Sequence, residues 1–438
     1  MGFEEAIAHL DALGVDVMKK MRPSMYRIEA LCDALNHPER TVPAIHVTGT
    51  NGKTSTARIA ASILSGTGLA VGTYTSPHLQ TITERIVLGG RPIPGSDFGD
   101  VFDHLHPFLQ TVEEKLGENL TYFEVLTGMF FLWAAEAPVD AMVVEVGLGG
   151  RWDATNVIVA PVSVVTNVGL DHTKLMGNDR KQIAREKSGI IKPDAVAVVG
   201  ERDPAVLAVI EGEAAGVGAG TSRLGRDFDV LGNRLALGGR HLSLRTSAAA
   251  YESLFLPLHG AHQGVNAAVA LEALARFLPG RPLDEEVVAE GLARSAVPGR
   301  LEVVRSGEGA APVVFDVAHN PDGMSALIAS LAEAFTFTRV NFVVGILSDK
   351  DYAGMLTEMA RLPSSLIVTQ PKSVRSVSIE DLKVEAAEIG LSCDAIDDVP
   401  DAVDAAIRAA APDELVCITG SHYVVGEART HLLGEPRA

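Results

Sequence analysis

Cysteine is scarce in this 438-residue sequence, which argues against a fold stabilised by disulfides or by zinc. Its three cysteines are Cys32, Cys393 and Cys417, an odd number without the paired spacing of metal ligands. Neither a disulfide framework nor a zinc site is therefore indicated. Free thiols are typical of a reducing compartment, so we expect a cytoplasmic protein.

Positive charge and long apolar runs are also lacking. The net charge is −19 at pH 7, whereas nucleic acids and anionic membranes require a broad basic surface, so we expect neither as a partner. No uninterrupted apolar run reaches the ~20 residues of a membrane span. The first residues, MGFEEAIAHLDALG, carry acids where a signal peptide carries lysines. We expect a soluble, unprocessed monomer in which any bound polyanion meets a local positive site.

Short runs rich in Val and Ile alternate with longer segments of helical periodicity. Four such runs are AIHV, AMVVEV, VSVVTNV and AVAVVG. They have strand length and are apolar on both faces, which predicts a parallel sheet covered by helices. Strand-then-helix order predicts a doubly wound α/β sheet with ligands beyond the carboxyl ends of its strands.

A second alternating series begins near residue 298, and the chain is long enough for two domains. The Pro298-Gly299 pair marks the change. We therefore predict one domain over residues 1–297 and a smaller α/β domain over residues 298–438. Residues 201–257 carry a weaker pattern, in which RLALGGRHLSLRT predicts a hairpin but no function.

The stretch IHVTGTNGKTST, residues 45–56, has most features of a phosphate-binding loop. Val47 stands where the pattern G-x-x-x-x-G-K-[ST] requires its first glycine. The loop follows an apolar strand and precedes a helix, so its backbone N–H groups and the helix dipole favour an anion. Lys53 would then contact outer phosphates and Thr54 a magnesium ion. The alternative is a glycine-rich turn without a ligand.

Eight further motifs follow along the chain. They are YTSPHL (74–79), TYFE (121–124), EVGLGGRWDATN (145–156), LDHT (170–173), REKSGIIKP (185–193), HQGVNAA (262–268), PGRLE (298–302) and DVAHNPDG (316–323). In this order they resemble the folylpolyglutamate synthase/dihydrofolate synthase family of the Mur ligase superfamily, over residues 20–428. The resemblance implies a Mur-ligase-like fold, with a P-loop doubly wound ATPase domain and a Rossmann-like C-terminal domain.

The resemblance also implies an activity and its cofactors. The expected enzyme is an ATP-dependent ligase that adds L-glutamate to tetrahydrofolate polyglutamates, to dihydropteroate or to both. A carboxylate needs a better leaving group than hydroxide before it can form an amide, and ATP supplies one by converting it to an acyl phosphate. Magnesium would offset charge on the transferring phosphoryl group. ADP and phosphate are the expected by-products.

Residues of the ATP and metal sites are carried over by the same resemblance. Those expected to bind ATP are Gly49, Thr50, Asn51, Gly52, Lys53, Thr54, Asn266, Arg300 and Asp316. Those expected at magnesium are Ser76, Glu145, His172, Thr54 and a carbamylated Lys187. Simpler interpretations stay open. Glu145 fits a salt-bridged strand end, His172 a core histidine, Arg300 an exposed linker charge, and Asp316 a turn or helix cap.

Lys187 has two opposed interpretations. Its spacing within DRKQIAREKSGII places it among several charges on a solvated helical face. In the family the corresponding lysine is carbamylated, which converts a cation into an anion. That modification requires a neutral amine, and therefore a desolvated lysine of lowered pKa.

Substrate-binding residues follow from the resemblance as well. Those expected to bind folate are Thr121, Tyr122, Phe123, Glu124, Trp152, Asp153 and Ala154. Aromatic rings stack on a flat pterin, and a carboxylate pairs with its N–H donors. Tyr122 and Phe123 fit a hydrophobic helix start equally well. The residues expected to bind glutamate are His319, Arg375 and Ser421, and the catalytic set is Lys53, Lys187 and His319.

Two other functions remain alternatives. One is a Mur-type ligase that acts on a non-folate carboxylate, and the other is a non-catalytic, ATP-gated binding protein of the same fold. Magnesium-dependent ADP release that requires both an acceptor acid and an amino acid would separate catalysis from binding.

Overall fold

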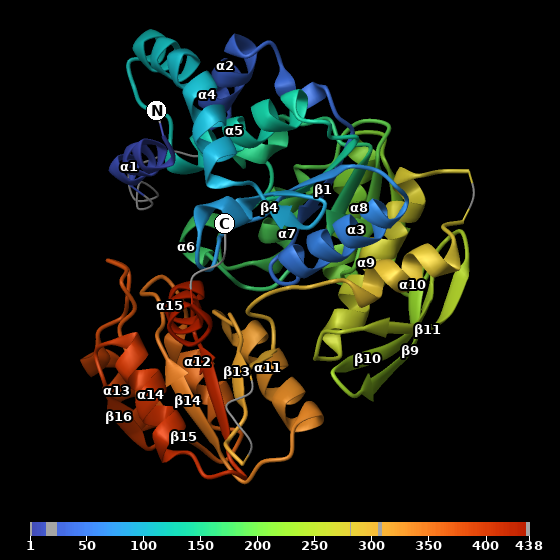
Figure 1. The fold of residues 1–438 in the computed structure, drawn as a ribbon. Coiled ribbons are helices and arrows are strands. Elements are labelled where there is room, and N and C mark those ends of the chain that lie inside the picture. Colours follow the sequence, from blue (N-terminus) through green and yellow to red (C-terminus); the bar gives the residue numbers. More distant parts are fainter. Residues whose placement is uncertain (1, 15–23, 281, 305–308, 435–438) are drawn as a thin grey trace.

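The computed structural model describes residues 2–14, 24–280, 282–304 and 309–434. Within these ranges the strands form sheets of eight, three and six strands. Figure 1 shows the six-stranded sheet and its helices as a separate lobe below the eight-stranded sheet, with the three-stranded sheet beside both. We call α1 to α10, with the first two sheets, the N-terminal domain, and β12 to α15 the C-terminal domain.

The eight-stranded sheet has the order β4-β3-β2-β5-β1-β6-β7-β8. Six neighbouring strands, from β2 to β8 in that order, are parallel, while β3 and β4 extend one edge in antiparallel fashion. β1 is central, so the loop after it opens at the middle of the carboxyl edge. The strands are β1 (Ala44–Thr48), β2 (Val71–Tyr74), β3 (Ile86–Leu88), β4 (Arg91–Pro92), β5 (Ala141–Glu145), β6 (Val162–Val165), β7 (Val196–Val199) and β8 (Gly220–Arg223).

Helices cover both faces of this sheet and bury two large cores, besides a smaller one between β6, β7, α7 and α8. One core joins the sheet to α1, α2, α4 and α5 through side chains such as Leu31, Leu105 and Phe130. The other joins it to α3, α9 and α10 through side chains such as Ile63 and Leu271. The helices are α1 (Phe3–Leu13), α2 (Tyr26–Ala34), α3 (Lys53–Gly66), α4 (Gly95–Leu116), α5 (Tyr122–Glu136), α6 (Thr173–Met176), α7 (Arg180–Ser188), α8 (Pro204–Gly216), α9 (His262–Phe277) and α10 (Glu285–Ala293).

The weakly patterned region forms the antiparallel three-stranded sheet, in the order β11-β10-β9. Its strands are β9 (Asp229–Ala236), β10 (Gly239–Arg245) and β11 (Ala250–Leu256), so the predicted hairpin is confirmed. Arg240 on β10 is 1% exposed and reaches the C-terminal domain, where its Nη1 lies 2.7 Å and its Nη2 3.0 Å from the two carboxylate oxygens of Glu333. The small sheet, itself part of the N-terminal domain, therefore contacts the C-terminal domain.

The C-terminal domain contains a six-stranded sheet in the order β12-β13-β17-β14-β15-β16, parallel except for β12. Its loops after β13, β14 and β17 are directed at the N-terminal domain. The elements are β12 (Glu302–Val304), β13 (Val313–Phe315), α11 (Pro321–Ala334), β14 (Val340–Val344), α12 (Tyr352–Met359), β15 (Ser364–Val368), α13 (Ile379–Glu388), β16 (Cys393–Ala395), α14 (Val399–Ala409), β17 (Leu415–Thr419) and α15 (His422–Leu433).

The predicted α/β class with parallel sheets is confirmed, whereas the antiparallel strands β3, β4 and β12 were not predicted. The Pro298-Gly299 pair lies between α10 and β12. None of the helices in the described part of the chain has the length and apolar character that a membrane span needs.

Candidate functional site

A cavity of about 750 Å³ lies where the carboxyl edges of the two parallel sheets meet. Loops of both domains line it. The predicted residues in its lining are Gly49, Thr50, Asn51, Gly52, Lys53, Thr54, Ser76, Thr121, Tyr122, Phe123, Glu124, Glu145, Trp152, Asp153, Ala154, His172, Lys187, Arg300, His319, Arg375 and Ser421. Asn266 and Asp316 are not part of that lining. The cavity is large enough for a substrate-sized ligand.

The loop between β1 and α3 contains Gly49 and Gly52, and Asn266 lies behind it. Gly52 caps α3 with a φ of +81°, and a Cβ at this position would lie 2.5 Å from the Oδ1 of Asn266. Gly52 is therefore required for both conformation and space. The ammonium of Lys53 folds back over the loop, 3.2 Å from the carbonyl oxygens of Gly49 and Thr50. Its charge thus lies at the N-terminus of α3.

Lys187 contacts the same loop from α7. Its Nζ donates to the carbonyl oxygen of Gly49 at 2.8 Å, and the residue is only 3% exposed. The interpretation from spacing alone, a solvated helical charge, is therefore wrong, because α7 turns this residue toward the sheet. Burial, reinforced by the charge of Lys53, lowers the pKa of Lys187 to about 7. A substantial neutral-amine population at neutral pH follows.

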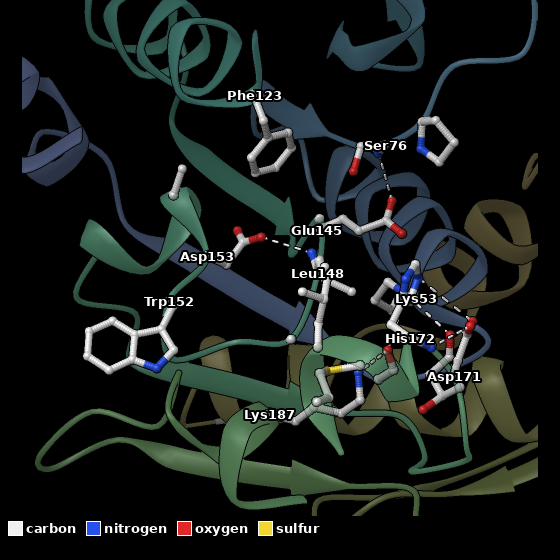
Figure 2. Close-up of a pocket in the computed structure, with 18 of the residues that line it drawn as sticks. Lys53, Ser76, Phe123, Glu145, Leu148, Trp152, Asp153, Asp171, His172 and Lys187 are labelled. Atoms are coloured by element: carbon white, nitrogen blue, oxygen red, sulfur yellow. Dashed lines mark hydrogen bonds and ion pairs between the residues drawn. The ribbon is translucent and has the colours of Figure 1, made fainter. Parts of the chain in front are cut away.

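Glu145, at the end of β5, joins the loop to the residue after β2. It is 1% exposed, and its Oε1 accepts a hydrogen bond from the Thr54 hydroxyl at 2.8 Å. Its Oε2 accepts from the backbone N–H of Ser76 at 3.2 Å. Burial raises the pKa of Glu145, and the charge of Lys53 opposes that shift. Figure 2 shows Glu145 between Ser76 and Lys53.

The donors around Glu145 fit a hard cation. Thr54, Ser76 and Glu145 all present oxygen, the ligand that Mg²⁺ prefers, and Mg²⁺ usually takes only one or two carboxylates and completes its shell with water and phosphate oxygens. Within the described ranges, no three His, Cys, Asp or Glu side chains gather as a metal cluster. A metal here would therefore depend on hydroxyl groups and on a bound phosphate.

His172 lies beside two charged residues, Asp171 and Lys350, that the sequence did not single out. Its Nε2 is 3.1 Å from the ammonium of Lys350, which donates at 2.7 Å to Oδ1 of Asp171. Burial, followed by the charge of Lys350, lowers the pKa of His172 to about 4, so its ring is neutral at pH 7. Asp171 belongs to the quoted motif LDHT, but Lys350 lies in the C-terminal domain, and no sequence pattern pairs the two.

His319 enters the cavity from the loop between β13 and α11. Its Nδ1 donates to the carbonyl oxygen of Val317 at 2.8 Å, which leaves Nε2 directed at Asp171, 3.7 Å from Oδ2. Burial lowers the pKa of His319 to about 3. The next residue, Asn320, donates from Nδ2 to Oδ2 of Asp171 and to Oδ1 of Asn51, each at 3.1 Å. One C-terminal loop thus contacts both the β1–α3 loop and Asp171.

The opposite end of the cavity is aromatic and acidic. Figure 2 shows Trp152 and Asp153 at this end, away from Asp171 and His172. Trp152 is 50% exposed and is therefore available to stack on a flat ligand. Asp153 is occupied locally, because its Oδ2 accepts from the backbone N–H of Leu148 at 2.9 Å. Burial raises the pKa of Asp153.

Residues 121–124 begin α5 and are largely engaged already. Thr121 and Glu124 form a reciprocal capping box. The Nε of Arg27 lies 3.1 and 3.0 Å from the two Glu124 oxygens. The guanidinium of Arg85 lies 5.5 Å from the centre of the Tyr122 ring, and both cations line the cavity. Arg27 and Arg85 were missed because no motif contains them.

The remaining predicted residues include two with clear structural partners. Both oxygens of Asp316 accept backbone N–H bonds, from Leu301 at 3.0 Å and Ala318 at 2.8 Å, as the turn interpretation requires. The Ser421 hydroxyl caps α15 and donates to the carbonyl oxygen of Gly345 at 2.7 Å. Arg375 has its Nη2 4.0 Å from Oδ1 of Asp349.

Comparison with known proteins extends over both domains. Residues 47–274 match the Mur ligase middle domain, and residues 299–422 match the Mur ligase glutamate ligase domain. The dihydrofolate synthase/folylpolyglutamate synthase of Mycobacterium tuberculosis is 40% identical over an alignment that covers 95% of this chain and 92% of that protein.

Solved structures show the same likeness. The Mycobacterium tuberculosis folylpolyglutamate synthase complexed with ADP and AMPPCP superimposes with a TM-score of 0.91 at 40% identity, covering 99% of this chain and 100% of that one. A bifunctional folylpolyglutamate synthase/dihydrofolate synthase with Mn, AMPPNP and L-glutamate bound gives a TM-score of 0.85 at 30% identity, with 99% and 98% covered. This chain therefore belongs to the dihydrofolate synthase/folylpolyglutamate synthase family of Mur ligases, which are ATP-dependent ligases.

Proposed function

We propose that this enzyme joins L-glutamate to the carboxylate of a folate-type acceptor, either a tetrahydrofolate polyglutamate or dihydropteroate, with release of ADP and phosphate. One observation carries the proposal: the phosphate-type loop with Lys53, Lys187 and Glu145 faces His319 and Arg375 of the other domain across a single cavity. Two substrates held by different domains can meet there. The activities after which its relatives are named support the same reaction.

The proposed first step is transfer of the γ-phosphoryl group of ATP to the acceptor carboxylate. Loop N–H groups and Lys53 would hold the phosphates, with Asn266 behind the loop and Arg300 opposite. A magnesium ion held by Thr54, Ser76 and Glu145, with His172 as a further ligand, would neutralise negative charge on the phosphates. The ribose contact assigned to Asp316 stays a prediction, since its carboxylate holds the linker turn.

In the second step the glutamate amine attacks the acyl phosphate, and phosphate leaves. Arg375, the neutral ring of His319 and Ser421 line the cavity and would bind the amino acid. Because both domains enclose the cavity, docking would exclude water from the acyl phosphate. One chain supplies every residue of this site, which supports a monomer. Its three cysteines are free, which supports a reducing, cytoplasmic location.

We also propose that Lys187 is carbamylated. The neutral amine would attack carbon dioxide and lose one proton, giving an N-carboxylate. Two observations support this step: Lys187 is buried with a pKa near 7, and its Nζ shares the Gly49 carbonyl oxygen with the Lys53 ammonium. Two ammonium groups on one oxygen repel each other, whereas a carbamate beside Lys53 forms an ion pair.

The acceptor is assigned to the opposite end of the cavity. Trp152 and Tyr122 supply aromatic surface, and Phe123, Asp153 and Ala154 border it. Glu124 is bound by Arg27, so pairing with a pterin would require that salt bridge to rearrange. Arg85 and Arg27 provide the local positive charge that an anionic acceptor needs in a chain of net charge −19.

The deciding assay offers dihydropteroate, tetrahydrofolate and its one-carbon forms with labelled glutamate, ATP and Mg²⁺, and resolves the products by mass. Each addition should require both substrates and release one ADP. Failure of every acceptor would reject the folate assignment, and ADP release without an acceptor would leave only nucleotide hydrolysis.

A further inference from the structure

Asp171 is a meeting point of the two domains inside the cavity. It lies in the N-terminal domain and is 8% exposed. Its Oδ1 is 2.7 Å from the Nζ of Lys350, and its Oδ2 is 3.1 Å from the Nδ2 of Asn320 and 3.7 Å from the Nε2 of His319. These three partners come from two loops of the C-terminal domain. A single carboxylate therefore holds both loops.

Lys350 depends on this contact. Its side chain is 6% exposed, and its other acidic partner among the described residues, Asp349, is farther away at 3.9 Å. A buried ammonium without a close counter-charge is strongly unfavourable. Because Asp171 and Lys350 belong to different domains, each is neutralised in this way only while the domains are docked as they are here.

The same contact orients a residue of the proposed reaction. The His319 ring is held at Nδ1 by the Val317 carbonyl oxygen, and its Nε2 faces Asp171. Loss of the Asp171 charge would free Lys350 and remove the group that His319 faces. The β1–α3 loop would keep its own contacts with Lys53 and Lys187.

We propose that Asp171 and Lys350 are positioning residues that dock the C-terminal domain, so that His319 and Arg375 reach the reacting centre only when this ion pair is formed. The inference rests on the proposed function, since it assigns glutamate to the C-terminal side of the cavity. Its direct consequence is that breaking the pair lowers kcat/KM for glutamate while the KM for ATP changes little.

The chain offers a matched control. Arg240 and Glu333 form a second ion pair between the domains, at 2.7 Å, and neither residue lines the cavity. Asp171→Asn and Glu333→Gln therefore make the same chemical change, from carboxylate to amide, in an interdomain ion pair. The first pair lies inside the site and the second outside it. If both ion pairs merely held the domains together, the two substitutions would lower activity equally.

The experiment compares wild type, Asp171→Asn, Lys350→Met, their double variant and Glu333→Gln, after thermal unfolding has shown each to be folded. Asp171→Asn and Lys350→Met should each lower kcat/KM for glutamate by about 100-fold, because each leaves one buried charge unpaired. The KM for ATP should stay within about threefold, and Glu333→Gln should stay within about threefold for both substrates. The double variant should be little worse than either single one.

Two further measurements keep the test independent of stability and of the substrate assignment. Lys350→Arg retains the cation and should recover at least about a tenth of wild-type kcat/KM. Small-angle scattering with AMPPNP should show a more extended particle for Asp171→Asn than for wild type. The inference would be overturned if Glu333→Gln lost as much activity as Asp171→Asn, or if the losses of the two single variants multiplied in the double variant. Unchanged scattering would overturn it as well. If wild type itself adds no glutamate, the proposed function fails, while scattering still tests the docking contact.

Discussion

The pKa of Lys187 leads to a quantitative prediction about carbamate formation. With a pKa of about 7, roughly half of this amine is neutral at pH 7, against about one in 2,500 for an ordinary lysine of pKa ~10.4. Only the neutral form reacts with carbon dioxide. The rate of carbamylation at fixed dissolved carbon dioxide should therefore rise about fivefold from pH 6 to pH 7 and less than about twofold from pH 7 to pH 8.

The assay starts from enzyme that has been depleted of carbon dioxide at low pH. Activity is then followed as a function of time after carbon dioxide is restored, and ¹³C-labelled carbon dioxide provides a spectroscopic signal for the carbamate carbon. Both signals should recover with the same rate at each pH. Holding dissolved carbon dioxide constant, instead of total bicarbonate, removes the pH dependence of the reagent.

Variants separate the carbamate from the amine. Lys187→Ala should be nearly inactive and partly recoverable by acetate or formate, which replace the missing anion. Lys187→Arg should stay inactive, because a permanent cation cannot form the carbamate. A recovery rate that climbs tenfold per pH unit between pH 7 and pH 9 would refute the reasoning, since it would show an amine of ordinary pKa. An active arginine variant would do the same.

Three other changes test separate parts of the site and fold. Lys53→Ala should lower kcat by about 100-fold to 1,000-fold while thermal unfolding stays near wild type, because it removes a cation on the phosphates; near-normal turnover would remove the loop from catalysis. Glu145→Gln should raise the Mg²⁺ concentration for half-maximal activity, since an amide is a poorer ligand for a hard cation; an unchanged requirement would exclude Glu145 from the metal site. Burial lowers the pKa of His46 to about 3. Between pH 6.5 and pH 3 the unfolded chain therefore takes up a proton on His46 that the folded chain does not bind, and the free energy of unfolding falls as the pH falls. Between pH 6.5 and pH 5, urea unfolding should show wild type losing ~2 kcal/mol more than His46→Gln, and equal losses would contradict the assignment.

Local chemistry explains why the nucleotide half of the fold was predictable. AIHV and the following Gly-Lys-Thr predicted a strand, a loop and a helix, and the structure has β1, the glycine-bent loop and α3 at these positions. Each depends on neighbours within a few residues. The hairpin around Gly238-Gly239 was predictable for the same reason, but its separation into a sheet of its own depends on packing against α9 and α10.

Contacts between distant segments explain what the sequence did not reveal. The charge-rich pattern of α7 indicated a solvated face, yet Lys187 is buried because α7 packs beside the β1–α3 loop. Asp171 and Lys350 are 179 residues apart, and only the docking of two domains brings them together. The burial of Asp316 and its bonds to the linker are likewise consequences of tertiary structure.

The helix α11 is fixed to the N-terminal domain at both of its ends. Asn320, which caps its first turn, bonds to Asn51 and Asp171, and Glu333 in its last turn pairs with Arg240. Its 14 residues separate these anchors by ~21 Å. Two fixed points leave a rigid body one rotation, about the line that joins them. While both anchors hold, the C-terminal domain can only roll about the axis of α11, so any wider separation of the two domains requires one anchor to release first.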